Sequence, residues 1–138
     1  MNKILHGLDG SQSSLKALEE AIKLAKLYRA ELHTISVEEI PRFSETIDEI
    51  DEEKELEDSK FKEIINQAQT MAAAHGLKID CHIQVGHEVK NIIEFIKKNN
   101  INLLVIGFMG NSAIYERVMG STCQTLVRMA PCSVLVVK

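Results

Sequence analysis

A short, mostly apolar run at residues 101–106 (INLLVI) does the most to narrow the fold of this chain. The run is too short to cross a membrane, is rich in aliphatic and β-branched residues and ends at Gly107. This pattern is typical of a strand buried on both faces, as in the parallel sheet of an α/β protein. A sheet of this kind needs helices on both sides, so the rest of the chain should supply them.

Strand-like and helix-like segments alternate along the remainder of the chain. We expect strands at residues 3–8, 31–37, 77–85, 101–106 and 132–137, and helices at residues 13–30, from within 44–58 to 75, 89–96 and 121–129. The helical segments repeat apolar residues at steps of three and four, and no hairpin signal joins the strands. We therefore predict an α/β fold: one domain, residues 1–138, with a doubly wound five-stranded parallel sheet, about four helices and right-handed crossovers.

Glycines follow the strand at 101–106 with a spacing suited to anion binding. Gly107 and Gly110 come first, and residues 120–122 (GST) follow after nine more residues, where the last helix should begin. Glycines let an oxyanion approach backbone amides closely, and the first turn of a helix offers unpaired N–H groups and a partial positive charge. The segment predicts a cradle for phosphate groups. The alternative is a plain surface loop whose hydroxyls only cap the helix.

Composition argues against several classes of function. A formal net charge of −4 without a clustered basic face argues against a nucleic-acid-binding surface. No apolar stretch is long enough for a membrane span, and the first residues show no signal-peptide pattern, so we expect a cytoplasmic protein with no membrane contact. The three cysteines include no CxxC pair and the five histidines lack ligand-like spacing, so we predict neither a disulfide framework nor a zinc site.

Residues 44–58 carry the strongest local charge, with nine acidic residues and one lysine. Acidic residues favour the N-terminal end of a helix, so we expect this segment to begin the long helix that stops before Gly76. A flap over a site or a contact with a partner is the alternative for this segment.

The glycine spacing of residues 107–121, G-x2-G-x9-G-S, resembles the ATP-binding signature of the universal stress protein family. Residues 5–11 (LHGLDGS) are similar to the first strand of that family and its Asp-containing turn, and residues 130–137 (APCSVLVV) to its last strand. The resemblance covers essentially the whole chain. It implies the strand order 3-2-1-4-5, in which the first and fourth strands are neighbours and Asp9 faces the glycine loop.

The resemblance also implies a role for each residue of the site. An adenine nucleotide, ATP or another, would lie between the ends of the first and fourth strands. Gly7 and Leu8 would contribute backbone groups near the ribose or base, and Ser36 and Val37 would hold the adenine. Asp9 would contact the nucleotide or a Mg²⁺ ion bound with the phosphates; otherwise it only forms the turn. The implied binding residues are Gly7, Leu8, Asp9, Ser36, Val37, Gly107, Met109, Gly110, Gly120, Ser121, Thr122 and Cys123.

Four residues in or near the proposed cradle have features of their own. Phe108 and Met109 stand where many relatives carry a small polar residue and a basic or imidazole side chain, which removes a side-chain donor but leaves the amides. Arg117 could replace the missing charge. Cys123 lies at a helix start, where a thiolate would be favoured and redox sensing is a minor hypothesis.

We expect a regulatory protein of the stress response that passes the state of its bound nucleotide to an unknown downstream protein. No poised nucleophile or general base lies near the glycine loop, so at most a weak ATPase is predicted. The apolar last strand leaves a sheet edge, and a homodimer through residues 132–137 is expected, as in the family. Two alternatives stay open: a slow ATP-hydrolysing enzyme that uses Asp9, and a dimeric interaction module that binds no nucleotide.

Overall fold

A five-stranded parallel sheet forms the centre of the molecule. The computed structural model describes residues 2–39, 47–109 and 119–138. Its strands are β1 (Lys3–Gly7), β2 (Glu31–Glu38), β3 (Ile79–Val85), β4 (Leu103–Gly107) and β5 (Ser133–Val137). They lie in the order β3-β2-β1-β4-β5, and every neighbouring pair is parallel. The predicted fold class, strand order and direction are confirmed.

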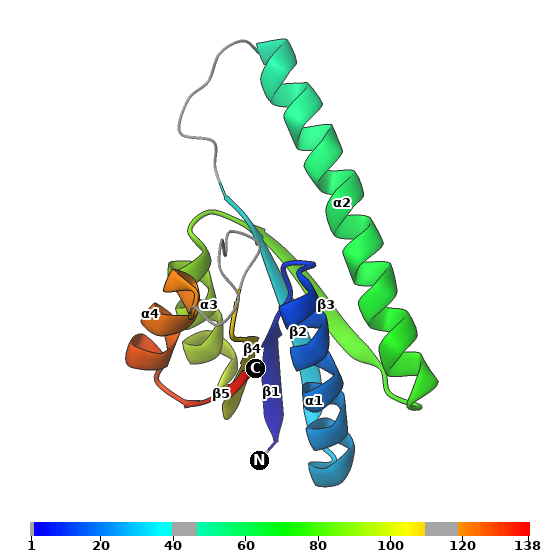
Figure 1. The fold of residues 1–138 in the computed structure, drawn as a ribbon, viewed down its shortest axis with the longest axis vertical. Coiled ribbons are helices and arrows are strands. Elements are labelled where there is room, and N and C mark those ends of the chain that lie inside the picture. Colours follow the sequence, from blue (N-terminus) through cyan, green and yellow to red (C-terminus); the bar gives the residue numbers. More distant parts are fainter. Residues whose placement is uncertain (1, 40–46, 110–118) are drawn as a thin grey trace.

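Two helices cover each face of the sheet (Figure 1). The helices are α1 (Gln12–Tyr28), α2 (Ile47–Ala74), α3 (Glu88–Asn99) and α4 (Ser121–Met129). α1 and α2 pack on one face, and α3 and α4 pack on the other. The N-terminal part of α2 extends past the carboxyl ends of the strands, as Figure 1 shows. The expected helix through the acidic segment is confirmed from Ile47 onward, and residues 44–46 lie outside the described residues.

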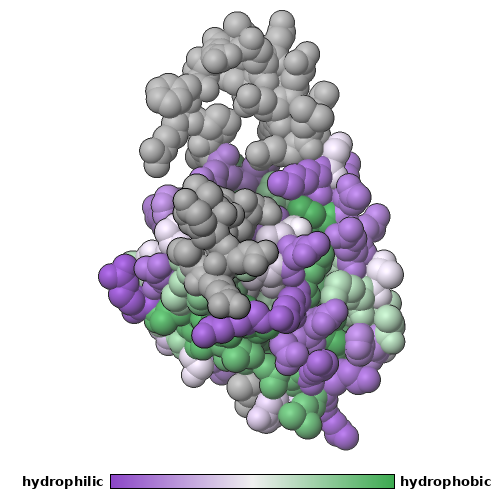
Figure 2. Space-filling model, viewed as in Figure 1, coloured by the Kyte–Doolittle hydropathy of each residue, from purple (hydrophilic) through white to green (hydrophobic). Residues whose placement is uncertain are grey.

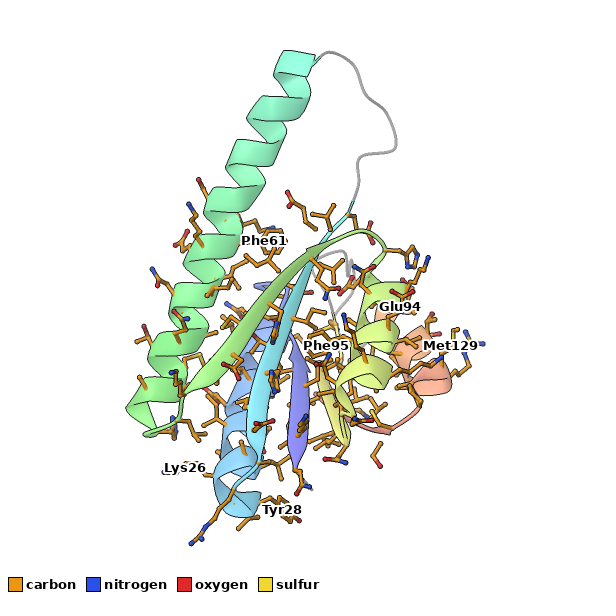
Figure 3. All side chains as sticks on the ribbon, turned by 180° about the vertical axis from the view of Figure 1, so that it is seen from behind. Lys26, Tyr28, Phe61, Glu94, Phe95 and Met129 are labelled. Atoms are coloured by element: carbon orange, nitrogen blue, oxygen red, sulfur yellow. The ribbon has the colours of Figure 1, made fainter. Side chains whose placement is uncertain are left out.

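Alternation along the strands divides the interior into two cores. Ile4 of β1 points into the core under α1 and α2, whereas its neighbour Leu5 points into the core under α3 and α4. Both side chains are fully buried, which contributes about 1.5–3 kcal/mol for each residue of this size. Figure 3 shows Phe61 of α2 and Phe95 of α3 on the two helical layers that cover these faces.

The turn after β1 is fixed by side-chain hydrogen bonds and by close packing. Asp9 Oδ1 accepts from the backbone N of Ser11 at 2.9 Å and from its Oγ at 2.6 Å. Ser11 in turn caps α1, because its Oγ accepts from the N of Ser14 at 3.1 Å. Gly10 has a positive φ of 82°, and a Cβ there would lie 2.5 Å from Cδ1 of Ile64. Only glycine therefore lets α2 pack so closely on this turn.

Strand β4 starts two residues later than predicted. Asn100 takes a left-handed conformation that ends α3, and the N of Ile101 donates to the carbonyl of Ile96 at 3.1 Å. Asn102 Oδ1 accepts from the amides of Asn2 and Lys3 at 2.8 and 2.9 Å. Ile101 therefore closes α3 and Asn102 fixes the start of β1, and neither residue extends β4.

Candidate functional site

A cavity of about 450 Å³ lies at the carboxyl ends of β1, β2 and β4, where the strand order reverses. Parallel α/β sheets bind ligands at this place. Segments from both helical layers complete the walls. The lining residues are Gly7, Leu8, Asp9, Ser14, Val37, Glu38, Glu39, Lys60, Phe61, Glu88, Ile92, Ile106, Gly107, Met109, Gly120, Ser121, Thr122, Cys123 and Leu126.

Of the predicted binding residues that the structure describes, all except Ser36 line this cavity. Ser36 is buried and its Oγ donates to the carbonyl of Leu8 at 2.7 Å, so it joins β2 to the turn after β1. The Ser36 side chain therefore holds Leu8, which lines the cavity, and does not line the cavity itself. Gly110 and Arg117 lie outside the described residues.

The loop after β4 uses its own amides to fix its path. The N of Phe108 donates to the carbonyl of Val137 at 2.9 Å, and the N of Met109 donates to Oγ of Ser13 at 3.1 Å. The N of Gly120 donates to the carbonyl of Phe108 at 3.0 Å. These three amides already donate to acceptors within the protein. The expected phosphate cradle therefore has fewer open donors than the glycine spacing predicted.

Gly107 allows α1 to approach the end of β4 closely. A Cβ on Gly107 would lie 2.4 Å from Oγ of Ser13 and 2.7 Å from its carbonyl carbon. The same serine receives the amide of Met109. Gly107 therefore serves packing between α1 and the loop as well as lining the cavity.

The first turn of α4 carries the donors that stay open. Gly120 is the N-cap, with φ −60° and ψ 149°, and has no side chain to cap the helix. Across the described residues, the amides of Ser121, Thr122 and Cys123 have no protein acceptor. Three N–H groups and the positive end of the helix dipole therefore face the cavity, which favours an anion there.

The structure shows the surroundings of Phe108 and Cys123, which the sequence did not reveal. Phe108 does not line the cavity, and Nζ of Lys138 lies 5.4 Å from its ring centroid. The Cys123 side chain is buried, and burial raises the pKa of its thiol, so the expectation of a favoured thiolate at this helix start is wrong.

Carboxylates outnumber cations along the described walls. Asp9, Glu38, Glu39 and Glu88 line the cavity, and Lys60 is the basic residue among the described lining residues. Burial, together with the nearby charges of Asp9 and Glu39, raises the pKa of Glu88 to about 7. Within the described residues, no group of three or more His, Cys, Asp or Glu side chains is arranged to hold a metal ion.

Nine of the described lining residues had no predicted role in binding, among them the charged or aromatic residues Lys60, Phe61 and Glu88. The first two come from α2, far along the chain, and no spacing in the sequence connects them with the glycine loop. The position of Glu88 could have been predicted, because it comes three residues after the end of β3 and the carboxyl ends of parallel strands lie at one edge of the sheet.

A second cavity of about 660 Å³ continues between α3 and α4. It shares Glu39, Glu88, Ser121 and Thr122 with the first cavity. The two cavities therefore meet beside the first turn of α4.

None of the helices in the described part of the chain is both long enough and apolar enough to span a membrane.

Comparison with known proteins identifies what this chain is similar to. The sequence model of the universal stress protein family matches residues 1–138, which confirms the resemblance seen in the glycine spacing. A universal stress protein of Methanocaldococcus jannaschii is 33% identical over 138 residues, covering 99% of this chain and 81% of the relative. The structure of UspA from Lactobacillus plantarum superposes with a TM-score of 0.89 at 25% identity, covering 99% of this chain and 97% of that one. A crystal structure of a universal stress protein in complex with cAMP gives a TM-score of 0.75 at 27% identity, with the same coverage.

Proposed function

The chain belongs to the universal stress protein family, and we propose that it is a cytoplasmic regulatory protein of the stress response that binds an adenine nucleotide, ATP or one with fewer phosphates. The site would be the cavity between the ends of β1 and β4. The observation that carries this proposal is the first turn of α4, where three amides have no acceptor among the described residues and line a cavity of about 450 Å³. That volume lies within the range of small-molecule sites, about 300–1,000 Å³.

The walls of the cavity divide into two chemically different parts. The phosphate group would lie against the amides of Ser121–Cys123 and the hydroxyls of Ser121 and Thr122. The adenine would lie against apolar side chains away from α4, among them Leu8 after β1, Val37 of β2 and Ile92 of α3. A related structure that holds cAMP supports this choice of ligand class.

Mg²⁺ would enter with the phosphates. Mg²⁺ keeps several waters and takes one or two protein carboxylates together with phosphate oxygens. Asp9 lines the cavity, and no cluster of three metal-binding side chains occurs among the described residues. This donor set fits a metal that the nucleotide carries, with Asp9 as its protein ligand, and does not suit a metal bound by the protein alone.

Binding without efficient hydrolysis is the activity that these residues support. Hydrolysis would need a side chain that positions water in line with the leaving phosphate. Asp9 is the candidate that the sequence offers, but its Oδ1 accepts from Ser11 and its proposed role is toward Mg²⁺. At most a weak ATPase is proposed. The second candidate, an interaction module without nucleotide, is favoured by the paired amides of Phe108, Met109 and Gly120 and by the excess of carboxylates on the walls.

The edge of the sheet at β5 is the proposed surface for a homodimer. Among the described strands, β5 pairs with β4 alone, and its residues 134–137 are partly exposed and apolar. Figure 2 shows apolar side chains gathered on the side of the molecule where β5 lies. We propose pairing through residues 132–137, with a downstream protein as a further partner. Sedimentation should give a dimer; a monomer at every concentration would contradict this pairing.

Substitution of Ser121 tests the nucleotide site. Ser121 is the first residue of α4, where proline fits a helix but has no N–H to donate. Ser121→Ala removes only the hydroxyl and serves as the matched control. In calorimetric titrations with AMP, ATP and ATP-Mg²⁺, Ser121→Pro should bind at least about tenfold more weakly than Ser121→Ala, since a charge-assisted hydrogen bond contributes about 1.5–3 kcal/mol.

Circular dichroism should show the same helix content in both variants. Equal affinities of Ser121→Pro and Ser121→Ala would contradict the role of the amide. No binding of any adenine nucleotide by the wild-type protein would favour the interaction module.

A further inference from the structure

Glu88 occupies the point where the two cavities meet. It is the first residue of α3, directly after the N-cap His87, and it lines both cavities. Ser121 and Thr122, from the first turn of α4, line both cavities as well. The carboxyl group therefore shares the space in which the proposed function places a phosphate group.

The surroundings of Glu88 are mostly acidic. Asp9 contributes a carboxylate from the turn after β1, and Glu38 and Glu39 contribute two from the end of β2. Among the described residues, the cations on the same two cavities are Lys60 from α2 and Lys90 and Lys97 from α3. The N-cap His87 and Glu94 of α3 line the second cavity as well. No ion pair joins Glu88 to any of these cations in the described part of the chain.

We propose that Glu88 couples anion binding to proton uptake, so that a phosphate group reaches the first turn of α4 together with a proton on Glu88 unless a divalent cation offsets the charge. The inference rests on the proposed function, because it concerns the same cavity. It makes Glu88 a determinant of which charge form of a nucleotide the cavity accepts.

The coupling follows from electrostatic repulsion in a partly buried site. Burial, Asp9 and Glu39 already raise the pKa of Glu88 to about 7, so protonated and ionised forms coexist near neutral pH. A phosphate anion brought beside the carboxyl raises that pKa further. Linkage then requires proton uptake on binding, and affinity falls as the pH rises through this range. The proton comes from the solvent and is held on a carboxylate oxygen of Glu88.

Ligand charge should decide the size of the effect. A terminal phosphate, as in AMP, carries up to two negative charges, whereas the cyclic diester of cAMP carries one. Coulomb repulsion scales with that charge, so ionised Glu88 should weaken AMP binding more than cAMP binding. Mg²⁺ should reduce the difference, because it neutralises the phosphate charge.

Titrations without divalent ions, from about pH 6 to about pH 8, test this inference. The ligands are AMP and cAMP, and the proteins are the wild type, Glu88→Gln and Glu94→Gln. Glu94 is the matched control, because it is an exposed carboxylate on the same helix and does not line the first cavity (Figure 3). The pH dependence that comes from ionisation of the ligand affects both proteins alike. It therefore cancels in the ratio of the wild-type Kd to the Glu88→Gln Kd.

For AMP, this ratio should rise by about threefold to tenfold across the range, and for cAMP it should rise less. Calorimetry in buffers of different ionisation enthalpy should show uptake of about half a proton near pH 7 by the wild type and Glu94→Gln, and none by Glu88→Gln. A ratio that stays flat with pH, or a change of equal size in Glu94→Gln, would overturn the inference and leave the nucleotide site in place. Failure of every protein to bind either ligand at any pH would overturn the proposed function and the inference with it.

Discussion

Replacement of Gly107 by alanine should loosen the contact between α1 and the loop after β4. The added Cβ would lie 2.4 Å from Oγ of Ser13 and 2.7 and 2.8 Å from its backbone carbon and oxygen. Backbone atoms cannot turn aside as a flexible side chain can, so α1 or the end of β4 must shift. Gly7→Ala is the matched control, because Gly7 lines the same cavity and, among the described residues, its Cβ would contact Cγ2 of Ile106 alone, at 3.3 Å.

Two effects set the expected cost of Gly107→Ala. Overpacking of a well-packed interior costs about 1–3 kcal/mol. The shift would also break the hydrogen bond of 3.1 Å from the N of Met109 to Oγ of Ser13, which contributes about 1 kcal/mol. We therefore expect the free energy of unfolding to fall by about 2–4 kcal/mol in Gly107→Ala and by less than about 1 kcal/mol in Gly7→Ala.

Urea denaturation followed by circular dichroism measures both costs. The denaturation midpoint of Gly107→Ala should fall while the slope m stays unchanged, which indicates a change in stability alone. The fold should persist, and the nucleotide affinity should fall because the wall at Met109 moves. A Gly107→Ala variant as stable as Gly7→Ala would refute the packing role derived for Gly107.

Two further predictions concern buried polar groups. His6 is fully buried and burial lowers its pKa from 6.5 to about 4, so the unfolded chain takes up a proton that the folded protein rejects, and stability should be lost as the pH falls from about 6.5 toward 4. The loss attributable to His6 should be about 3 kcal/mol, and denaturation curves of His6→Gln between these pH values should lack that part of the slope. Ser36→Ala removes the donor to the carbonyl of Leu8 and should lower the free energy of unfolding by about 1–3 kcal/mol; an unchanged denaturation midpoint would show that this bond does not hold β2 to the turn.

The sequence predicts the local structure of the described strands and helices well. The alternation of helical and strand patterns yields the parallel sheet, because each pattern reflects burial of one element. The strand order needed the family resemblance, since it depends on contacts between segments far apart in the sequence. The predicted fourth strand shows that the ends of elements are harder to predict than their type. Gly107 ends β4 as predicted, but Ile101 closes α3 instead of extending β4.

Contacts between distant segments account for what sequence patterns missed. The serine that receives the amide of Met109 lies 96 residues away in the chain, and nothing in its own neighbourhood indicates that role. Lys60 and Phe61 reach the cavity because Gly10 lets α2 pack on the turn after β1. Cys123 shows a related limit, since its helix position favours a thiolate whereas its burial, set by tertiary packing, opposes one.

Amide chemical shifts give the most direct test of the central claim that the first turn of α4 binds the phosphate group. In ¹H–¹⁵N correlation spectra recorded during titration with AMP, the amides of Ser121, Thr122 and Cys123 should shift most strongly, with proton shifts to lower field as they begin to donate to phosphate oxygens. The amides of Phe108 and Met109, which already have acceptors, should shift less. Saturable binding of AMP that leaves the three α4 amides unchanged would contradict the account.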